Sequence, residues 1–239
     1  MFAGTNPQQV AALRAPSPVS FFRGLRTDYM VSPGGGRPSP QAYLVEQEAG
    51  FSLRPHFHQS HQFQVVVAGC GTLGVHELTP QTVHYASLEA GYGPIVAGPQ
   101  GLHYFTLRAV TDHSAAPLPQ ERHRMRPGLV KKQCTVTAPS GGWAAGRSCG
   151  LREIIAPDEA GLAAWSSGAG PATAVPLPPT LAGACRFYLV VAGGVQGEAG
   201  TFATGAVLFA TSDAAPVLSA TEDGTHLLVL QFPPQALDD

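Results

Sequence analysis

The sequence predicts an all-β protein made of two similar units in tandem. Three observations favour this fold class. Glycine and proline account for 28 and 22 of the 239 residues, and both interrupt helices. Short runs rich in Val, Leu, Phe, Tyr and Thr are bounded by Gly, Pro or Asp, as in a protein of many short strands. Finally, 44% of the chain is hydrophobic and the net charge is −2, which indicates a packed core and excludes a disordered chain.

Seven runs have the composition of strands. They span residues 42–47, 61–68, 102–109, 132–137, 187–192, 207–210 and 226–232. One segment, residues 158–165, has a helix-like start, because Pro157 precedes an aspartate that can cap a first turn. It is brief and contains Gly161, so we expect a single short helix that does not organise the fold.

Two sequence matches recur at nearly the same offset and predict a duplicated unit. The run Val-Val-Ala-Gly at 66–69 returns at 190–193, a shift of 124. The run Gly-Leu-His at 101–103, which precedes an apolar segment, returns as Gly-Thr-His at 224–226, a shift of 123. Because the order and the spacing both agree, we expect two copies of one unit of roughly 110 residues.

The composition also excludes several kinds of partner. No stretch approaches the 18 apolar residues of a membrane span, and residues 1–20 lack the charged start and apolar run of a secretory signal. Basic residues cluster only at 120–126, beside prolines, so we expect no nucleic-acid surface. The four cysteines are widely spaced and form no Cys-x-x-Cys pair. We therefore expect reduced thiols, a cytoplasmic location, and neither a membrane nor a nucleic acid as partner.

A pair of histidines in the first unit carries the candidate chemistry. On an extended strand His56 and His58 point to the same face, and Gln62 follows an even number of positions later. Two neutral imidazoles and an oxygen donor on one face of a rigid sheet can bind a divalent transition metal. An isolated His-x-His pair is more often two polar residues at the end of a strand. The surrounding pattern has to decide between these two interpretations.

That pattern resembles the first signature of the cupin superfamily. The chain has Gly50, five residues, His56, one residue, His58, three residues, Gln62, six residues and Gly69. In cupins this signature carries two histidines and a glutamate that bind a metal inside a small antiparallel barrel. Every position fits except Gln62, where the family has Glu. Replacing the anionic ligand by an amide weakens the expected metal site.

The second cupin signature, Gly, five residues, Pro, one residue, Gly, two residues, His, is approximated by Gly93, Pro99 and Gly101. Its histidine position falls on Tyr104, and the nearest histidine, His103, stands one place early. Counting from Pro99 puts Tyr104 on the face of the site, whereas counting by hydrophobicity puts His103 on the core-directed face. Both residues stay candidates, His103 as the fourth metal ligand and Tyr104 as a ligand or a substrate contact.

The resemblance implies two tandem cupin (jelly-roll) barrels, a bicupin, with the metal-type motif only in the first. We expect an N-terminal arm over 1–40, an N-terminal barrel over 41–111, a proline-containing linker over 112–128 and a degenerate barrel over 129–239. In that second barrel the shift of 124 puts Thr180, Ala182 and Arg186 at the positions of the two histidines and the glutamine. None of these recreates the site.

The resemblance further implies a metal-dependent enzyme of the dioxygenase, isomerase or lyase type that acts on a small organic molecule. The expected metal ligands are His56, His58, Gln62 and His103, and the expected substrate contacts are Tyr104, Arg54 and Arg108. The expected metal is Fe, Mn, Ni or Zn, or none. The lost glutamate favours the alternative, a non-catalytic cupin that binds a small molecule with little or no metal. We assign no catalytic residue and expect a homodimer.

Overall fold

A computed structural model describes residues 1–31, 38–137 and 150–237 and divides the chain into two compact units. One unit, the N-terminal barrel, is Ala12–Thr137. The other, the C-terminal barrel, combines Met1–Ala11 with Ala138–Asp238. Both units are built from antiparallel strands, so the all-β prediction is confirmed.

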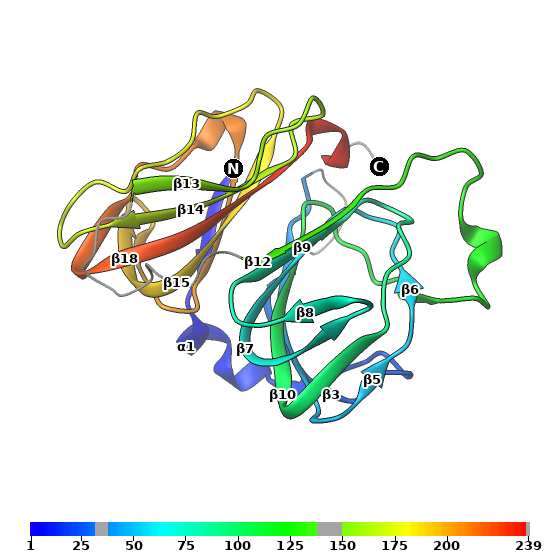
Figure 1. The fold of residues 1–239 in the computed structure, drawn as a ribbon. Helices are drawn as coiled ribbons and strands as arrows, with labels where there is room; N and C mark the ends of the chain where they lie inside the picture. The colour runs from blue at the N-terminus through cyan, green and yellow to red at the C-terminus, as the bar shows by residue number, and fades with distance from the viewer. Residues whose placement is uncertain (32–37, 138–149, 238–239) are drawn as a thin grey trace. The chain divides into compact units, whose positions relative to one another are not determined.

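The N-terminal barrel is formed by a nine-stranded sheet in the order β12-β9-β7-β10-β4-β3-β2, with β5 paired to β10 and β8 paired to β7 (Figure 1). Its strands are β2 (Ala15–Pro16), β3 (Gly24–Val31), β4 (Gln41–Gln47), β5 (Ser52–Leu53), β7 (Gln62–Leu73), β8 (His76–Leu78), β9 (Thr82–Ala86), β10 (Ile95–Arg108) and β12 (Gln133–Thr137). Two further strands, β6 (His56–Phe57) and β11 (Ala116–Pro117), pair with each other. The 3-10 helix η2 (Arg122–Arg124) follows β11.

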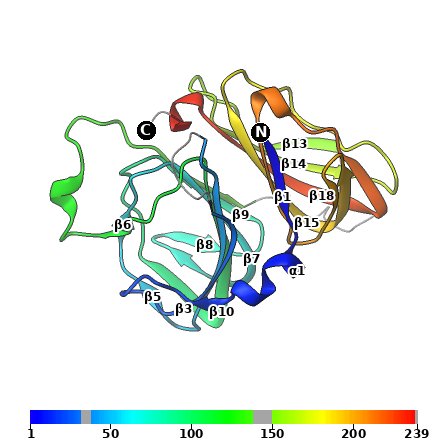
Figure 2. The ribbon, with the colours of Figure 1, turned by 180° about the vertical axis from the view of Figure 1, so that it is seen from behind.

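The C-terminal barrel is formed by a seven-stranded sheet in the order β1-β17-β15-β18-β14-β13, with β16 paired to β15 (Figure 2). Its strands are β1 (Phe2–Thr5), β13 (Gly150–Ile155), β14 (Ala163–Ala169), β15 (Cys185–Gly197), β16 (Gly200–Ala203), β17 (Val207–Thr211) and β18 (Ser219–Phe232). The helical elements are α1 (Pro7–Val10), η1 (Ala11–Leu13), η4 (Ser212–Ala214) and η5 (Pro234–Leu237). No helix in the described residues is long and apolar enough to cross a membrane.

The strand register confirms the duplication. Phe63 of β7 lies opposite Leu107 of β10, and Phe187 of β15 lies opposite Leu230 of β18. The repeated glycine has a steric reason: a Cβ on Gly69 would lie 2.2 Å from the carbonyl oxygen of Gly101, and one on Gly193 would lie 2.1 Å from that of Gly224. Both glycines also have a positive φ, 74° and 65°. Only glycine therefore fits where the long central strands of each barrel bend past each other.

The helix expected over 158–165 is absent. Asp158 and Leu162 close a tight turn around Gly161, in which the Asp158 carboxylate accepts from the Leu162 amide at 2.8 Å. The chain then enters β14, whose residues pair with β18 from Ala163 onward. Gly161 has a φ of +89°, which ends any helical turn at that point. Tertiary pairing of an apolar segment outweighs the local helix signal.

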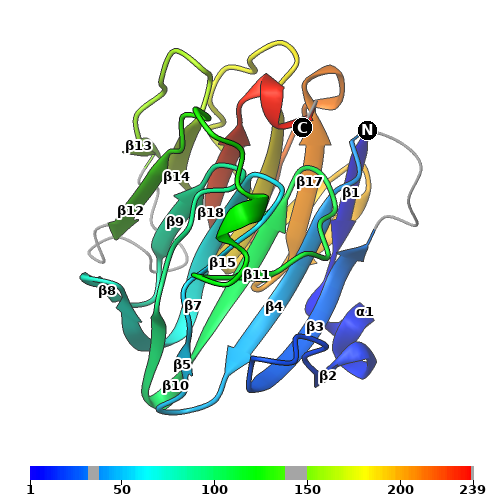
Figure 3. The ribbon, with the colours of Figure 1, turned by 90° about the vertical axis from the view of Figure 1, so that its right-hand side faces the viewer.

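The observed units also differ from the domain boundaries expected from the sequence. Residues of the expected arm belong to both sheets, because β1 pairs with β17 (Figure 3) and β3 pairs with β4. From the expected second barrel, β12 pairs with β9 and so completes the N-terminal barrel. Composition marks turns and linkers, but it does not show which sheet edge an isolated strand joins. Residues 32–37 of the expected arm and 138–149 of the expected second barrel lie outside the described residues.

Three of the four cysteines, Cys70, Cys134 and Cys185, are free thiols. Cys149 lies outside the described residues.

Candidate functional site

The N-terminal barrel contains a partly open cavity of about 440 Å³, counted with its solvent-filled mouth. Its polar lining includes His56, His58, Tyr104 and Thr106, and Tyr43 and Leu53 are among its apolar walls. Tyr104 and Thr106 alternate along β10, so both point to the inside of the barrel. Because β6 and β10 are held by backbone pairing, these side chains project from a rigid frame.

Five inward-facing positions of this barrel carry a more polar side chain than their equivalents in the C-terminal barrel. In the N-terminal barrel they are Gln64, Thr82, His84, Tyr104 and Thr106, and their register equivalents are Tyr188, Ala206, Leu208, Leu227 and Val229. All five equivalents belong to one hydrophobic core cluster. The fold itself is therefore compatible with hydrophobic side chains at these positions, so the polar side chains mark the N-terminal barrel as the candidate site.

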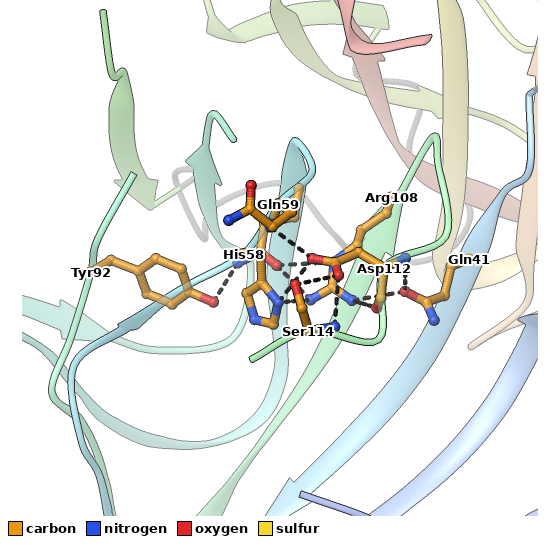
Figure 4. A network of polar contacts seen from close by, with 8 residues as sticks. Gln41, His58, Gln59, Tyr92, Arg108, Asp112 and Ser114 are labelled. Carbon is orange, nitrogen blue, oxygen red and sulfur yellow. Dashed lines mark hydrogen bonds and ion pairs between the residues drawn. The ribbon is translucent and has the colours of Figure 1, made fainter. Parts of the chain in front are cut away.

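Arg108 lies at the centre of a hydrogen-bond network beside the cavity (Figure 4) and is 1% exposed. Its Nε and Nη2 donate to Oε1 of Gln62 at 3.2 and 2.9 Å. Its Nη1 donates to Oε1 of Gln41 and to the backbone carbonyl of Asp112, both at 2.7 Å. Nη2 also lies 3.1 Å from Nδ1 of His58. Four of the five guanidinium N–H groups thus have an oxygen acceptor inside the protein, and the fifth points to Nδ1 of His58.

His58 lies between the guanidinium of Arg108 and the carboxylate of Asp112, whose Oδ2 is 3.3 Å from its Nδ1. Nδ1 serves one of them at a time, accepting from Arg108 or donating to Asp112. Asp112 also accepts from the Gln59 amide at 2.9 Å and from the Ser114 amide and hydroxyl at 2.7 and 2.6 Å. Burial acts to raise the pKa of Asp112, but the hydrogen bond with His58, the charge of Arg108 and the Ser114 bond outweigh it and hold that pKa well below its usual range.

Both histidines of the pair are neutral. Burial, together with the charge of Arg108, lowers the pKa of His56 to about 4 and that of His58 to about 3. Nδ1 of His56 lies 3.0 Å from the carbonyl oxygen of Arg54, which can only accept. Nδ1 therefore carries the proton, and Nε2 of His56 keeps a lone pair.

The hydrogen-bond partners of Gln62 also fix the orientation of its side-chain amide. Arg108 can only donate, so Oε1 of Gln62 faces the guanidinium and Nε2 faces the other way. Nε2 donates to the hydroxyl of Tyr92 at 2.5 Å. The ring of Tyr92 in turn lies against the His56 ring, with centroids 4.6 Å apart. Arg108 therefore fixes the amide of Gln62, and Gln62 in turn holds the ring of Tyr92 beside that of His56.

The structure brings most of the expected site residues together. His56, His58, Gln62 and Arg108 meet in the network, and Tyr104 borders the cavity. In the pairing of β10 with β7 the register shifts between His103 and Tyr104, and Tyr104 faces the cavity. This agrees with the alternative that counts from Pro99.

Two expected site residues lie elsewhere. His103 lies opposite Glu46 of β4 on the other face of the sheet from Tyr104. Arg54 is exposed, and its guanidinium lies 4.9 Å from the centroid of the Phe21 ring. Neither side chain lines the cavity.

Sequence reasoning missed Asp112 and Ser114, which belong to the expected linker. They lie at the site because β11 returns along β6, pairing Ala116 with Phe57. No local pattern announces that return. Tyr92 was missed for the same reason: its backbone bridges to His56, accepting from the His56 amide and donating to the His56 carbonyl at 3.1 and 3.0 Å. The alternation of side chains along β9 turns His84 into the barrel. This alternation was the one sequence signal that could have placed His84 near the site.

The donor set does not fit a divalent metal. The oxygen of Gln62, the expected third ligand, is occupied by two hydrogen bonds from Arg108. The guanidinium also places a permanent positive charge 3.1 Å from His58, where it repels a dication. His103 faces away, and the described residues hold no group of three or more His, Cys, Asp or Glu side chains able to bind a metal ion.

Comparison with known proteins identifies the architecture. No protein-family model matches the chain, and no curated protein sequence matches it. Among solved structures, the nickel(II) complex of the pirin YhhW from Escherichia coli has a TM-score of 0.60 at 12% identity, covering 98% of this chain and 100% of that one. An 11S globulin from Wrightia tinctoria, described with an auxin-binding site, has a TM-score of 0.65 at 12% identity, covering 97% and 83%.

A third similar structure is the oxalate decarboxylase of Bacillus subtilis, which contains Mn(II) centres, with a TM-score of 0.57 at 11% identity, covering 94% and 76%. All three are two-barrel cupins. This chain has the bicupin fold. The predicted tandem barrels are therefore confirmed. Identities this low show the fold of the bicupin and leave its activity to the residues of its own site.

We predict that Arg108→Met destabilises the bicupin strongly. The change leaves Asp112 without its buried cation, leaves Oε1 of Gln62 without a donor and removes the shorter of two hydrogen bonds to Oε1 of Gln41, which should lower the free energy of unfolding by about 3 to 5 kcal/mol. Urea unfolding followed by fluorescence measures the effect. The matched control is Arg54→Met, which removes an exposed arginine and should change stability by less than about 0.5 kcal/mol. Equal effects of the two variants would contradict the central role of Arg108.

We also predict that stability falls as the pH is lowered from about 6.5 to about 4. In the unfolded chain histidine has its ordinary pKa of 6.5, whereas His56 and His84 have values of about 4 in the fold. Across this window the unfolded state binds protons that the native state excludes, so the unfolding free energy decreases with falling pH. The slope is about 1.4 kcal/mol per pH unit for each buried histidine.

Urea unfolding at pH 7.5, 6.0 and 5.0 tests the pH dependence. His84→Leu should flatten the dependence, whereas His123→Leu, which removes an exposed histidine, should leave it unchanged. An unaltered slope in His84→Leu would show that burial of this imidazole is not the cause.

Proposed function

We propose that the N-terminal barrel binds a small organic molecule through polar contacts and without a resident metal. The observation that carries the proposal is the contrast between the two copies of the unit. Five interior positions whose equivalents belong to an apolar core cluster in the C-terminal barrel hold Gln64, Thr82, His84, Tyr104 and Thr106 in the N-terminal barrel. Tyr104 and Thr106 also line a partly open cavity of about 440 Å³, counted with its mouth. Small-molecule sites are typically mainly apolar cavities with a few placed polar groups.

The cavity residues favour an uncharged ligand. Arg108 uses its donors within the protein, and Arg26, which borders the cavity, pairs with Asp28 at 2.6 Å. His56 is neutral and offers the lone pair of its Nε2. Burial raises the pKa of Tyr104 well above its ordinary value, so its phenol stays protonated. Apart from the Arg26–Asp28 ion pair, the polar groups around the cavity are thus neutral donors and acceptors, which suit hydroxyl and carbonyl groups.

We predict that neutral fragments bind this cavity in preference to anionic ones. Ligand-observed NMR with a library of small aromatic and aliphatic molecules should detect them, and His56→Leu should weaken the hits about tenfold or more through loss of a buried hydrogen bond. His76→Leu serves as the control that removes an exposed imidazole. The proposal fails if no fragment binds, or if binding is unaffected by the change at His56.

A second candidate function is the metal-dependent enzyme that the signature implies. Two observations favour it: the neutral rings of His56 and His58 lie 5.2 Å apart beside the cavity, and two structural relatives of the fold are a nickel-bound pirin and a manganese decarboxylase. Against it stands Arg108, which occupies the oxygen of the third expected ligand. The expected homodimer and cytoplasmic location stay predictions under either function.

We predict that the wild-type protein, prepared without a metal-affinity tag and exposed to Fe(II), Mn(II), Ni(II) and Zn(II) in turn, retains well below one equivalent of metal after dialysis. The reason is the guanidinium charge beside the ligand pair. Elemental analysis by mass spectrometry measures the content. A value near one equivalent that disappears in the His56→Ala, His58→Ala double variant would replace the metal-free proposal by the metal-dependent enzyme.

A further inference from the structure

The C-terminal barrel has a groove that neither cupin signature describes. It is formed by β1, by the turn between β15 and β16, and by the connection between β17 and β18. Its volume is about 450 Å³ counted with its open mouth, and about 160 Å³ can be reached by the centre of a water molecule. An apolar cavity of about 150 Å³ holds a benzene ring, so the groove has room for one ring. Its walls are five apolar residues and one acidic residue, namely Phe2, Ala214, Ala215, Pro216, Val217 and Glu198.

The connection between β17 and β18 has a counterpart in the N-terminal barrel, the connection between β9 and β10. There a later segment of the chain covers it. Arg126 pairs with Glu89 at 2.7 Å, and the Leu118 side chain lies so close to Gly91 that a Cβ on the glycine would be 2.6 Å from it. Glu89 is accordingly only 1% exposed. The cover of the N-terminal copy thus consists of a cation and an apolar side chain.

The C-terminal copy of this connection is open to solvent in the described part of the chain. Asp213, which corresponds to Glu89 at the shift of 124, is exposed, and its carboxylate lies 3.7 Å from the amino group of Met1. Val217 is 81% exposed, and Ala215 is exposed as well. Contiguous apolar side chains on an open surface mark a candidate binding site.

The charges of the groove and of its barrel favour a cationic ligand. Glu198 is the one charged residue among the walls of the groove, and it is exposed and pairs with none of the described residues. Residues 1–11 and 138–238, which form this barrel, contain eight Asp or Glu and three Lys or Arg, so the potential around the groove is negative. The face of the Phe2 ring also attracts a cation.

We propose that the groove binds a small protonated amine that carries one aromatic ring, with Glu198 as its counter-ion. The ring lies against the apolar walls and covers Pro216 and Val217, much as Leu118 covers the equivalent connection in the N-terminal barrel. The ammonium group takes the part that Arg126 has there. The groove belongs to the other barrel, so the inference does not depend on the function proposed for the outer cavity.

The test compares benzylamine, which is protonated at neutral pH, with benzyl alcohol, a neutral probe of nearly the same shape. Their dissociation constants are measured at low salt by NMR titration, followed through the backbone amides of Ala215 and Val217. The matched variants are Glu198→Gln and the control Glu222→Gln, which removes an exposed carboxylate of β18 that does not line the groove. We expect the wild type and the control to bind benzylamine about threefold more tightly, as for an exposed ion pair, and Glu198→Gln to lose that preference.

Several outcomes overturn the inference. One is a preference that is unchanged in Glu198→Gln, and another is an equal loss in Glu222→Gln, which would reflect only the net charge of the barrel. Equal affinity of the wild type for both probes, or amide shifts confined to the N-terminal barrel, would also overturn it. A further variant, Ala215→Leu, adds bulk to an exposed wall of the groove and should weaken both probes about tenfold; unchanged binding would show that the probes bind elsewhere.

Discussion

A buried guanidinium dictates the arrangement around the candidate site. Arg108 is 1% exposed, and a buried charge without hydrogen-bond acceptors costs several kcal/mol. Its acceptors come from separate parts of the chain: Gln41 on β4, Gln62 on β7, and the Asp112 carbonyl beyond β10. The orientation of Gln62, the position of Tyr92 and the pairing of His58 all follow from satisfying this one cation. The residue spacing that resembles a metal-binding cupin signature here surrounds a cation of the protein itself.

The same pair of residues occurs in the C-terminal barrel with its strands exchanged. There Arg186 lies on β15, and its Nε and Nη2 donate to Oε1 of Gln231 on β18 at 2.9 and 2.6 Å. In both barrels the guanidinium carbon lies 5.6 Å from the centroid of an aromatic ring, that of Tyr43 and that of Trp165. An arginine, a glutamine and an aromatic ring thus occupy equivalent positions in both barrels. The barrels differ at neighbouring interior positions, where His84 and Thr106 of the N-terminal barrel correspond to Leu208 and Val229 of the C-terminal barrel.

Sequence patterns predicted the strands, the duplication and the convergence of His56, His58 and Gln62, because alternation and turn residues are local properties. The choice between His103 and Tyr104 was beyond them, since a register irregularity in the paired strand decides which side chain faces inward. Arg108 was expected to contact a substrate, but its guanidinium donates to acceptors that come from distant segments of the chain. Hydrogen bonds between residues far apart in sequence are set by the tertiary fold, so a guanidinium that looks free to bind a substrate can prove to be fully used.

The edge strands β12 and β1 pair with strands far away in the sequence, and this affects the order in which the two sheets can form during synthesis. The N-terminal barrel needs β12, so its sheet closes only after residue 137 has left the ribosome. β1 waits longer for its partner, because Phe2 pairs with Ala210 of β17. Until β17 has been made, the backbone amides and carbonyls of β1 have no sheet to join, and such unpaired strands can pair with other chains. β1 therefore stays unprotected while most of the two barrels is synthesised.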